Sequence, residues 1–151
     1  MLIAKKPTKQ GLNIIIVGCG KVGLTLIEQL VKEGHDITII DQDAKKVQEV
    51  GSVYDVMGVA GNGASHRVQM DAGIASADLL IAVTESDELN LLCCTVANQV
   101  ANCSTIARVR TPDYSGEANY LRDKLGLAMI INPELEAARE IARILYLPTA
   151  L

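Results

Sequence analysis

The sequence contains no tryptophan and no phenylalanine, and only 4 of its 151 residues are tyrosine. Proteins that bind single-stranded nucleic acid usually stack the bases on aromatic side chains. No run of lysine or arginine stands out either, and the formal net charge is −4, so no basic surface for a phosphate backbone is indicated. Nucleic acid and acidic membrane surfaces are therefore poor candidate partners.

Long hydrophobic runs are also absent from the sequence. No apolar run approaches the roughly 20 residues that a helix needs to span a bilayer. The start, MLIAKKPTKQG, lacks the longer apolar segment that follows the positive charges of a signal peptide. We therefore expect a cytoplasmic protein that works at the inner face of the cell membrane only through a partner, with no direct membrane insertion.

The four cysteines form no C-x-x-C pair, which suits neither a zinc site nor a disulfide framework. We predict no metal site. Cys93 and Cys94 lie in an apolar helical run and are predicted to be small buried residues in a reducing compartment. Cys19 lies in a glycine-rich stretch, where it could be exposed when no ligand is bound.

Apolar residues make up 49% of the chain and charged residues 21%, an ordinary globular balance for one compact domain. Short apolar runs alternate with helical patterns, which predicts a Rossmann-like α/β fold with a doubly wound six-stranded parallel sheet. The expected strands are 12–17, 36–41, 56–61, 77–84, 105–110 and 128–131, and the expected helices are 21–33, 43–50, 65–72, 87–101, 115–124 and 133–147. The expected organisation is a tail and strand start at 1–12, a nucleotide-binding domain at 13–132 and a C-terminal helix for dimerisation at 133–151.

Gly18, Gly20 and Gly23 stand at G-x-G-x-x-G spacing between the first expected strand and the first helix. In a Rossmann fold these glycines allow a tight turn, close approach of a pyrophosphate and close helix packing, while the helix start attracts the phosphate charge. Asp41 ends the second strand, where a carboxylate should bind the adenosine ribose. The alternative is a ligand-free turn, with Asp41 capping the helix that follows.

The Asp41 charge would repel a 2′-phosphate, which favours NAD over NADP. Lys45 and Lys46 follow closely and could soften this preference. The alternative, which we favour, is that both lysines are solvated charges on a surface helix.

Two other strand ends add candidate groups. Gly61 to Gly63 follow the third strand and either pass the adenine edge or form a plain turn. Thr84 and Glu85 end the fourth strand, next to the first, where the chain order of a doubly wound sheet reverses and ligands bind. They could reach the middle of a dinucleotide.

Arg108 is a guanidinium within the otherwise apolar fifth strand. A fully buried arginine is rare unless it is paired. Arg108 could neutralise a phosphate with two parallel hydrogen bonds. The alternative is a structural salt bridge, for example to Glu88 or Asp78.

Several stretches together resemble the RCK and TrkA-N family of nucleotide-binding domains. They are GCGKVG with Asp41, GNGASHRVQMDAGIASADLLIAVTESDELNLLCC, IARVRTPDY and INPELEAAREIARIL. The resemblance implies a regulatory domain without turnover that binds NAD(H), or alternatively ATP or ADP, forms a homodimer or higher oligomer and controls a membrane potassium transporter or channel. Longer members of the family continue beyond this fold, so we expect a fragment or a protein without the second lobe. The candidate cofactor-binding residues are Gly18, Cys19, Gly20, Lys21, Val22, Gly23, Asp41, Gln42, Gly61, Asn62, Thr84, Glu85 and Arg108.

The rival interpretation is an NAD-dependent oxidoreductase, which needs an acid or base beside its substrate. His35 and His66 are not in an obvious catalytic setting. Tyr120 and Lys124 form a Tyr-x-x-x-Lys pair, but they belong to the helix between the fifth and sixth strands, where a core or surface role is expected. No residues remain for a substrate domain, so we expect a ligand-sensing module and not an enzyme.

The last helix carries two apolar edges at helical spacing. One stripe is expected to cover the sheet. The second edge is expected to bury itself against the same edge of a second copy. The first stripe comprises Leu135, Ala138, Ile141, Ala142 and Leu145, and the second edge comprises Ala137, Ile144 and Leu147.

Overall fold

The computed structural model describes residues 11–146, and its centre is a six-stranded sheet in which all neighbouring strands are parallel. The strand order is β3-β2-β1-β4-β5-β6, so the chain reverses direction across the sheet between β1 and β4. The doubly wound Rossmann-like fold is thus confirmed. The strands are β1 Asn13–Val17, β2 Asp36–Asp41, β3 Met57–Ala60, β4 Leu79–Ala82, β5 Ser104–Arg108 and β6 Met129–Ile131.

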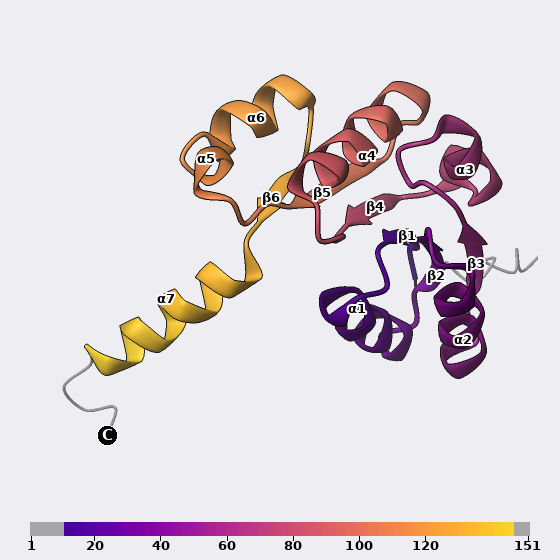
Figure 1. The fold of residues 1–151 in the computed structure, drawn as a ribbon, viewed down its shortest axis with the longest axis horizontal. Helices are drawn as coiled ribbons and strands as arrows, with labels where there is room; N and C mark the ends of the chain where they lie inside the picture. The colour runs from indigo at the N-terminus through magenta and orange to yellow at the C-terminus, as the bar shows by residue number, and fades with distance from the viewer. Residues whose placement is uncertain (1–10, 147–151) are drawn as a thin grey trace, which may run out of the picture.

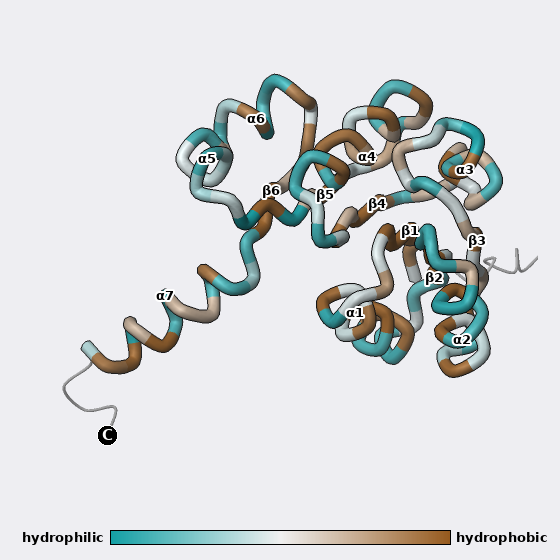
Figure 2. The backbone as a smooth tube through the Cα atoms, in the orientation of Figure 1, coloured by the Kyte–Doolittle hydropathy of each residue, from teal (hydrophilic) through white to brown (hydrophobic). Residues whose placement is uncertain are grey.

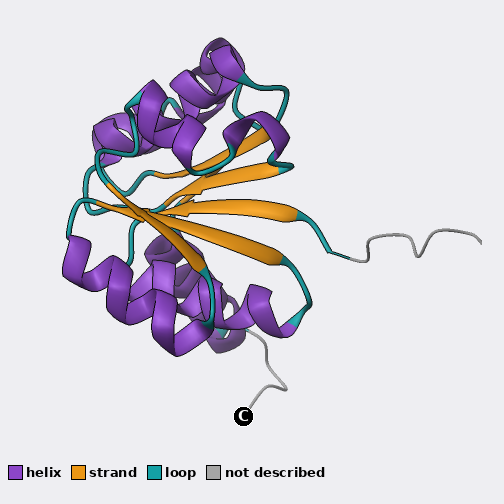
Figure 3. Ribbon diagram, turned by 90° about the vertical axis from the view of Figure 1, so that its right-hand side faces the viewer, coloured by secondary structure: helices purple, strands orange, loops and turns teal. Residues whose placement is uncertain are grey.

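Helices cover both faces of the sheet (Figure 1 and Figure 3). The helices α1 Lys21–Lys32 and α2 Ala44–Tyr54 pack on one face, and α3 His66–Asp71, α4 Asp87–Val100 and α6 Ala118–Leu125 pack on the other. Successive residues of β1 point to opposite faces. Ile14 and Ile16 therefore join one hydrophobic cluster, while Ile15 and Val17 join the other. A strand that is buried on both faces must be apolar throughout, which explains the isoleucine-rich run.

Strand and helix ends shift by one or two residues at several places, and three larger differences separate the helices from the sequence prediction. The helix expected at 43–50 continues through Gly51 to Tyr54 and ends at Asp55, which adopts the left-handed conformation at φ 54°. The single helix expected at 115–124 is two helices, α5 Pro112–Ser115 and α6, because Pro112 starts a helix early. A short 3-10 helix, Ile74–Ser76, was not expected.

The last helix, α7 Pro133–Leu145, leaves the carboxyl end of β6 and extends away from the sheet (Figure 1). Apolar and polar residues alternate along it, as Figure 2 shows. Ile141 is 61% exposed and Leu145 is 66% exposed. The expectation that their stripe covers the sheet is therefore wrong: the apolar residues of α7 find no surface within the described part of this chain. Leu147 lies outside the described residues.

Within residues 11–146, no helix is both long and apolar enough to cross a membrane. The described residues also bring no three histidine, cysteine or acidic side chains together as metal ligands. Cys93 and Cys94 belong to α4 and are fully buried, as predicted.

Candidate functional site

The glycine-rich turn between β1 and α1 has no room for side chains at two positions. Gly18 has a φ of 107°, and a Cβ there would lie 2.9 Å from the backbone nitrogen of Thr84. A Cβ on Gly23 would lie 1.9 Å from the carbonyl oxygen of Gly18. Glycine at both positions lets the start of α1 approach the ends of β1 and β4. The turn is fixed further by the Gly18 N–H, which donates to the carbonyl of Ile40 at 2.8 Å.

The N-terminus of α1 is open for an anion. Gly20 occupies the cap position and supplies no side-chain hydrogen bond, and the first turn holds no acidic residue. A Cβ on Gly20 would meet nothing closer than the Glu85 carboxylate at 3.9 Å. Backbone N–H groups in the first turn of a helix have no intrahelical acceptor and carry a partial positive charge. The turn therefore offers the arrangement that binds phosphate in Rossmann folds.

Asp41 ties the glycine-rich turn to the end of β2. Its Oδ2 accepts a hydrogen bond from the Cys19 N–H at 2.9 Å, and its Oδ1 accepts one from the Asp43 N–H at 2.9 Å. Asp43, and not Asp41, caps α2, because its carboxylate accepts from Lys45 and Lys46. The alternative role of Asp41 as the cap of α2 is therefore wrong.

The Cys19 side chain is only 2% exposed, so the expectation that it could be exposed without a ligand is also wrong. It turns away from the loop surface into the hydrophobic cluster beneath α1. Burial, with a further contribution from the Asp41 carboxylate, raises the pKa of the thiol to about 11. The Cys19 backbone, and not its sulfur, therefore faces the site.

A pocket of about 340 Å³ opens at the carboxyl ends of β1, β2 and β4. Of the predicted residues, Gly18, Asp41, Gln42, Gly61, Thr84 and Glu85 line it. Gly63, from the predicted stretch Gly61 to Gly63, lines it too, and Val17, Ile40, Ser86 and Leu89 line it without having been predicted. Asn62 does not line it, since its Oδ1 accepts from the Ala64 N–H at 3.0 Å and shapes the loop instead.

Asn90 holds the far wall of this pocket and was missed by the sequence analysis. It is fully buried, and its Oδ1 accepts from the Thr84 N–H at 2.8 Å and from the Thr84 hydroxyl at 2.6 Å. Its amide nitrogen donates to the carbonyl of Arg108 at 2.9 Å. One side chain of α4 thus joins the ends of β4 and β5. The available signal was a polar residue on the inward stripe of an apolar helix.

A second pocket, of about 730 Å³, adjoins the first at Glu85. It is lined by Gly20, Lys21, Val22, Glu85, Arg108, Arg110, Pro133, Glu134 and Ala137. The start of α1, the end of β5 and the first turn of α7 therefore face one space. The predicted residues Gly20, Lys21, Val22 and Arg108 belong to this second pocket, whereas Gly23 packs under the glycine-rich turn.

Arg108 is 5% exposed, and its Nη2 donates to Glu134 Oε1 at 2.5 Å. The predicted alternative partners are wrong: Glu88 accepts from the Tyr114 hydroxyl, and Asp78 accepts from the Asn13 N–H. Arg108 Nε has no hydrogen-bond partner in the described part of the chain. The hydrogen bond from Arg108 lowers the pKa of the Glu134 carboxyl, which therefore stays ionised near neutral pH.

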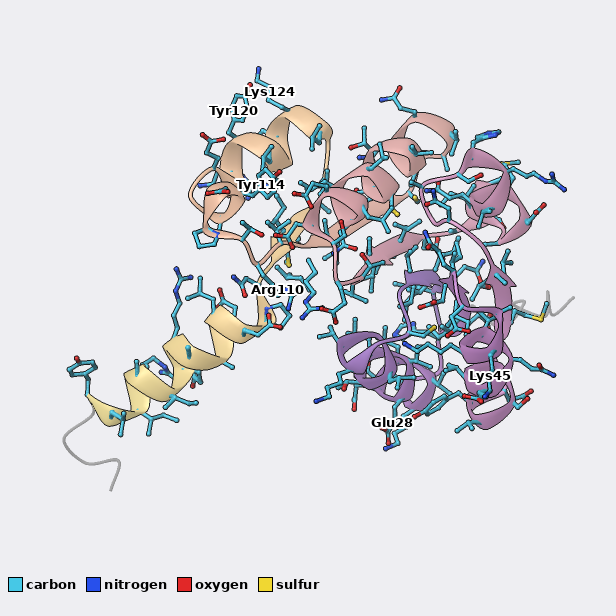
Figure 4. The ribbon with its side chains drawn as sticks, viewed as in Figure 1. Glu28, Lys45, Arg110, Tyr114, Tyr120 and Lys124 are labelled. Carbon is cyan, nitrogen blue, oxygen red and sulfur yellow. The ribbon has the colours of Figure 1, made fainter. Side chains whose placement is uncertain are left out.

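Arg110, which sequence reasoning missed, lies where α7 leaves the sheet (Figure 4). Its Nη2 donates to Glu85 Oε2 at 3.1 Å, and its Nη1 lies 3.9 Å from Glu134 Oε1. The buried Asp87 carboxylate accepts the backbone N–H groups of Arg110 and Thr111 at 3.1 and 2.8 Å. Burial acts to raise the pKa of Asp87, but the hydrogen bonds from Thr111 and Arg110 outweigh it and lower the pKa.

The residues of the rival oxidoreductase interpretation lie elsewhere. Tyr120 is 61% exposed, and Figure 4 shows it with Lys124 on the outer side of α6. His35 accepts a hydrogen bond from the Leu12 N–H, at the amino end of the sheet. Among residues 11–146, no histidine or tyrosine lines either pocket. The residues that the oxidoreductase interpretation considered therefore lie away from the two pockets.

A tight glycine turn at the reversal point of a doubly wound sheet, with an aspartate at the end of the second strand, defines a Rossmann-like domain of the nucleotide-binding type. Comparison with known families identifies the family within this class. Residues 14–133 match the family model of the TrkA-N domain, and the chain belongs to that family.

Named TrkA proteins align with most of this sequence. The chain is 39% identical over 143 residues to the Trk system potassium uptake protein TrkA of Haemophilus influenzae, which covers 93% of this chain and 31% of the relative. It is 33% identical over 135 residues to a TrkA homolog of Methanothermobacter thermautotrophicus, which covers 89% of this chain and 61% of the relative. The chain therefore spans about a third of the length of the first of these relatives.

Solved structures agree on the fold. The TrkA-N domain of the inner membrane protein ybaL from Escherichia coli superposes with a TM-score of 0.78 at 24% identity, covering 89% of this chain and 97% of that one. The GsuK channel bound to NAD gives a TM-score of 0.68 at 21% identity, covering 83% of this chain and 22% of that one. The Kef C-terminal domain of Shewanella denitrificans in its AMP-bound form gives 0.69 at 20% identity, covering 90% and 83%.

Proposed function

We propose that this domain senses an adenine nucleotide, NAD(H) or alternatively ATP or ADP, and regulates a membrane potassium transporter or channel. The observation that carries the proposal is the pocket of about 340 Å³ where the glycine-rich turn, Asp41 and Thr84 converge. The related folds named above were solved with NAD and with AMP, and a further GsuK structure holds ADP. NAD, AMP and ADP all contain an adenosine 5′-phosphate, so this common group is the one that we fit to the pocket.

Asp41 is the group that would bind the ribose. Two of its lone pairs accept backbone N–H groups, from Cys19 and Asp43. A carboxylate offers about four acceptor positions, so two remain for the 2′ and 3′ hydroxyls. The phosphates would then lie against the first turn of α1, where Gly20 leaves space and the backbone N–H groups face outward.

A regulatory role fits this site better than catalysis. Hydride transfer requires a positioned acid or base beside the substrate. The side chains at the junction of the two pockets are Thr84, Glu85 and Arg110, and Thr84 is held by Asn90 while Glu85 pairs with Arg110. The residues are thus arranged to bind charge and to couple strand ends to α7.

The exposed helix α7 supports a homodimer in this proposal. Ile144 is 42% exposed and Tyr146 87% exposed, and an amphipathic helix without a covering surface is unstable in water. Two copies that bury this helix against each other would remove the apolar area from water. The partner transporter would be reached from the cytoplasmic side of the membrane.

Titration calorimetry with NAD+, NADH, ATP and ADP, and with adenosine as a control, tests the proposal. We expect at least one nucleotide to bind with a dissociation constant well below about 1 mM, which corresponds to about −4 kcal/mol. NADH should stay unoxidised when common carbonyl compounds are added. If none of the four ligands binds a well-folded chain, the proposed function is wrong, and carbonyl-dependent NADH oxidation would favour the oxidoreductase.

A further inference from the structure

The first turn of α7 is fastened to the sheet by one carboxylate. Glu134 Oε1 accepts from Arg108 Nη2 at 2.5 Å and lies 3.9 Å from Arg110 Nη1. From Glu134 onward, every described residue of α7 is exposed. Among residues 11–146, the side-chain hydrogen bonds and ion pairs that join this helix to the end of β5 and the residues just after it are those of Glu134 with Arg108 and Arg110.

The two partners of this ion pair differ in their exposure to water. The Arg108 side chain is 6% exposed, whereas the Glu134 side chain is 53% exposed. A buried guanidinium without a partner is strongly unfavourable, so Arg108 must keep an anion beside it. Glu134 can return to water at little cost, because exposed ion pairs contribute little. The pair can therefore be broken by another anion that reaches Arg108, but not by water alone.

The pocket of about 730 Å³ gives such an anion a place. Its wall contains Arg108 and Glu134 together with Gly20, Lys21 and Val22 at the open N-terminus of α1. A phosphate at that helix start would face the same guanidinium that Glu134 now occupies. Arg108 Nε, which is buried and has no partner among the described residues, is a second donor for it. A guanidinium binds phosphate through two parallel hydrogen bonds, which a single carboxylate oxygen does not match.

We propose that a nucleotide phosphate and the Glu134 carboxylate compete for Arg108, so that phosphate binding releases the first turn of α7 from the sheet. Arg110 offers Glu134 a weaker alternative, because its guanidinium already pairs with Glu85. The inference rests on the proposed nucleotide site and adds how occupation of that site reaches α7. It makes Glu134 an internal competitor of the ligand.

Competition predicts the sign of a mutational effect. Glu134→Gln removes the competing charge, so ADP should bind about three- to tenfold more tightly than it binds the unmodified chain. Adenosine, which has no phosphate, should bind both chains equally. Glu136→Gln is the matched control, since Glu136 lies in the same helical turn and pairs with the exposed Arg139. It should leave both affinities unchanged.

Weaker ADP binding by Glu134→Gln would overturn the inference, because Glu134 would then assist the ligand, for example through a bridging cation. Unchanged ADP affinity would overturn it too. Glu134→Ala, which also removes the amide oxygen that could still accept from Arg108, should tighten binding at least as much as Glu134→Gln. If none of NAD+, NADH, ATP and ADP binds the unmodified chain or these variants, the proposed function fails as well, so the two failures are distinguishable.

Hydrogen–deuterium exchange supplies the readout on α7 itself. In the unmodified chain, ADP should speed exchange of the amides between Ala137 and Ile141, and adenosine should not. In Glu134→Gln these amides should exchange fast without ligand, and ADP should add no further change. Slower exchange of the unmodified chain with ADP would show that the ligand fastens α7, which contradicts the competition.

Discussion

Replacing Asp41 by alanine tests two roles of its carboxylate, one in the stability of the fold and one in nucleotide binding. It accepts two backbone hydrogen bonds, from Cys19 and from Asp43, each at 2.9 Å. Hydrogen bonds to a charged group contribute about 1.5–3 kcal/mol each when they are buried. Asp41 is half-buried, so water replaces part of this contribution. We expect Asp41→Ala to lower the free energy of unfolding by about 2 kcal/mol.

The same substitution should weaken nucleotide binding at least tenfold, or about 1.4 kcal/mol, because it removes the ribose acceptor and loosens the glycine-rich turn. The matched control is Asp43→Ala. Asp43 caps α2 through the N–H groups of Lys45 and Lys46, so its loss should cost about 1 kcal/mol of stability. Asp43 does not line the pocket, and its removal should change affinity by less than about twofold.

Urea unfolding followed by circular dichroism measures the first quantity, and titration calorimetry with ADP and NADH measures the second. Unchanged affinity in folded Asp41→Ala would refute the ribose role. If Asp43→Ala weakened nucleotide binding as much as Asp41→Ala, the direct role of Asp41 would be refuted, because the loss of affinity would then reflect a general loss of stability. Unchanged stability of Asp41→Ala would refute the structural tie between the glycine-rich turn and β2.

Three further predictions follow from the packing. Gly23→Ala should abolish folding or nucleotide binding, because its Cβ would lie 1.9 Å from the Gly18 carbonyl; native-like circular dichroism and affinity would contradict this. Asp87→Asn should cost about 2 kcal/mol in urea unfolding. Because the pKa of Asp87 is lowered from 3.8, its stabilisation is present above that pH and lost as the pH falls below it, so the variant should lose less stability on acidification. Replacing Ile141 and Ile144 by lysine should leave a folded monomer in sedimentation experiments; a monomeric unmodified chain at high micromolar concentration would contradict the proposed dimer.

The strands and the glycine-rich turn could be predicted because their signals are local. A strand buried on both faces needs a continuous apolar run, and Ile14 to Val17 provide one. The turn needs glycine at positions without space for a Cβ, and the spacing of Gly18 and Gly23 records that need. The placement of Thr84 beside β1 followed from topology, because a doubly wound sheet brings β4 next to β1.

The partners of buried polar groups could not be predicted, because they depend on distances between remote segments. Arg108 pairs with Glu134, which lies 26 residues later in the first turn of α7. The carboxylates of Glu88 and Asp78 accept hydrogen bonds from other donors. Asn90 reaches two strand ends that only the packed helix α4 brings together. The course of α7 could not be predicted either, because an apolar stripe indicates that a helix packs and does not indicate on what.

The glycine-rich turn is held in place by hydrogen bonds from the chain itself. The Gly18 N–H to Ile40 carbonyl and the Cys19 N–H to Asp41 carboxylate bonds hold it from both sides. Ordering a loop on association costs free energy and slows the encounter, and a preformed loop avoids both. Ligand association with this turn should therefore be a single fast kinetic phase. A slower phase that does not depend on ligand concentration would report the rearrangement of α7, and stopped-flow measurements can separate the two in time.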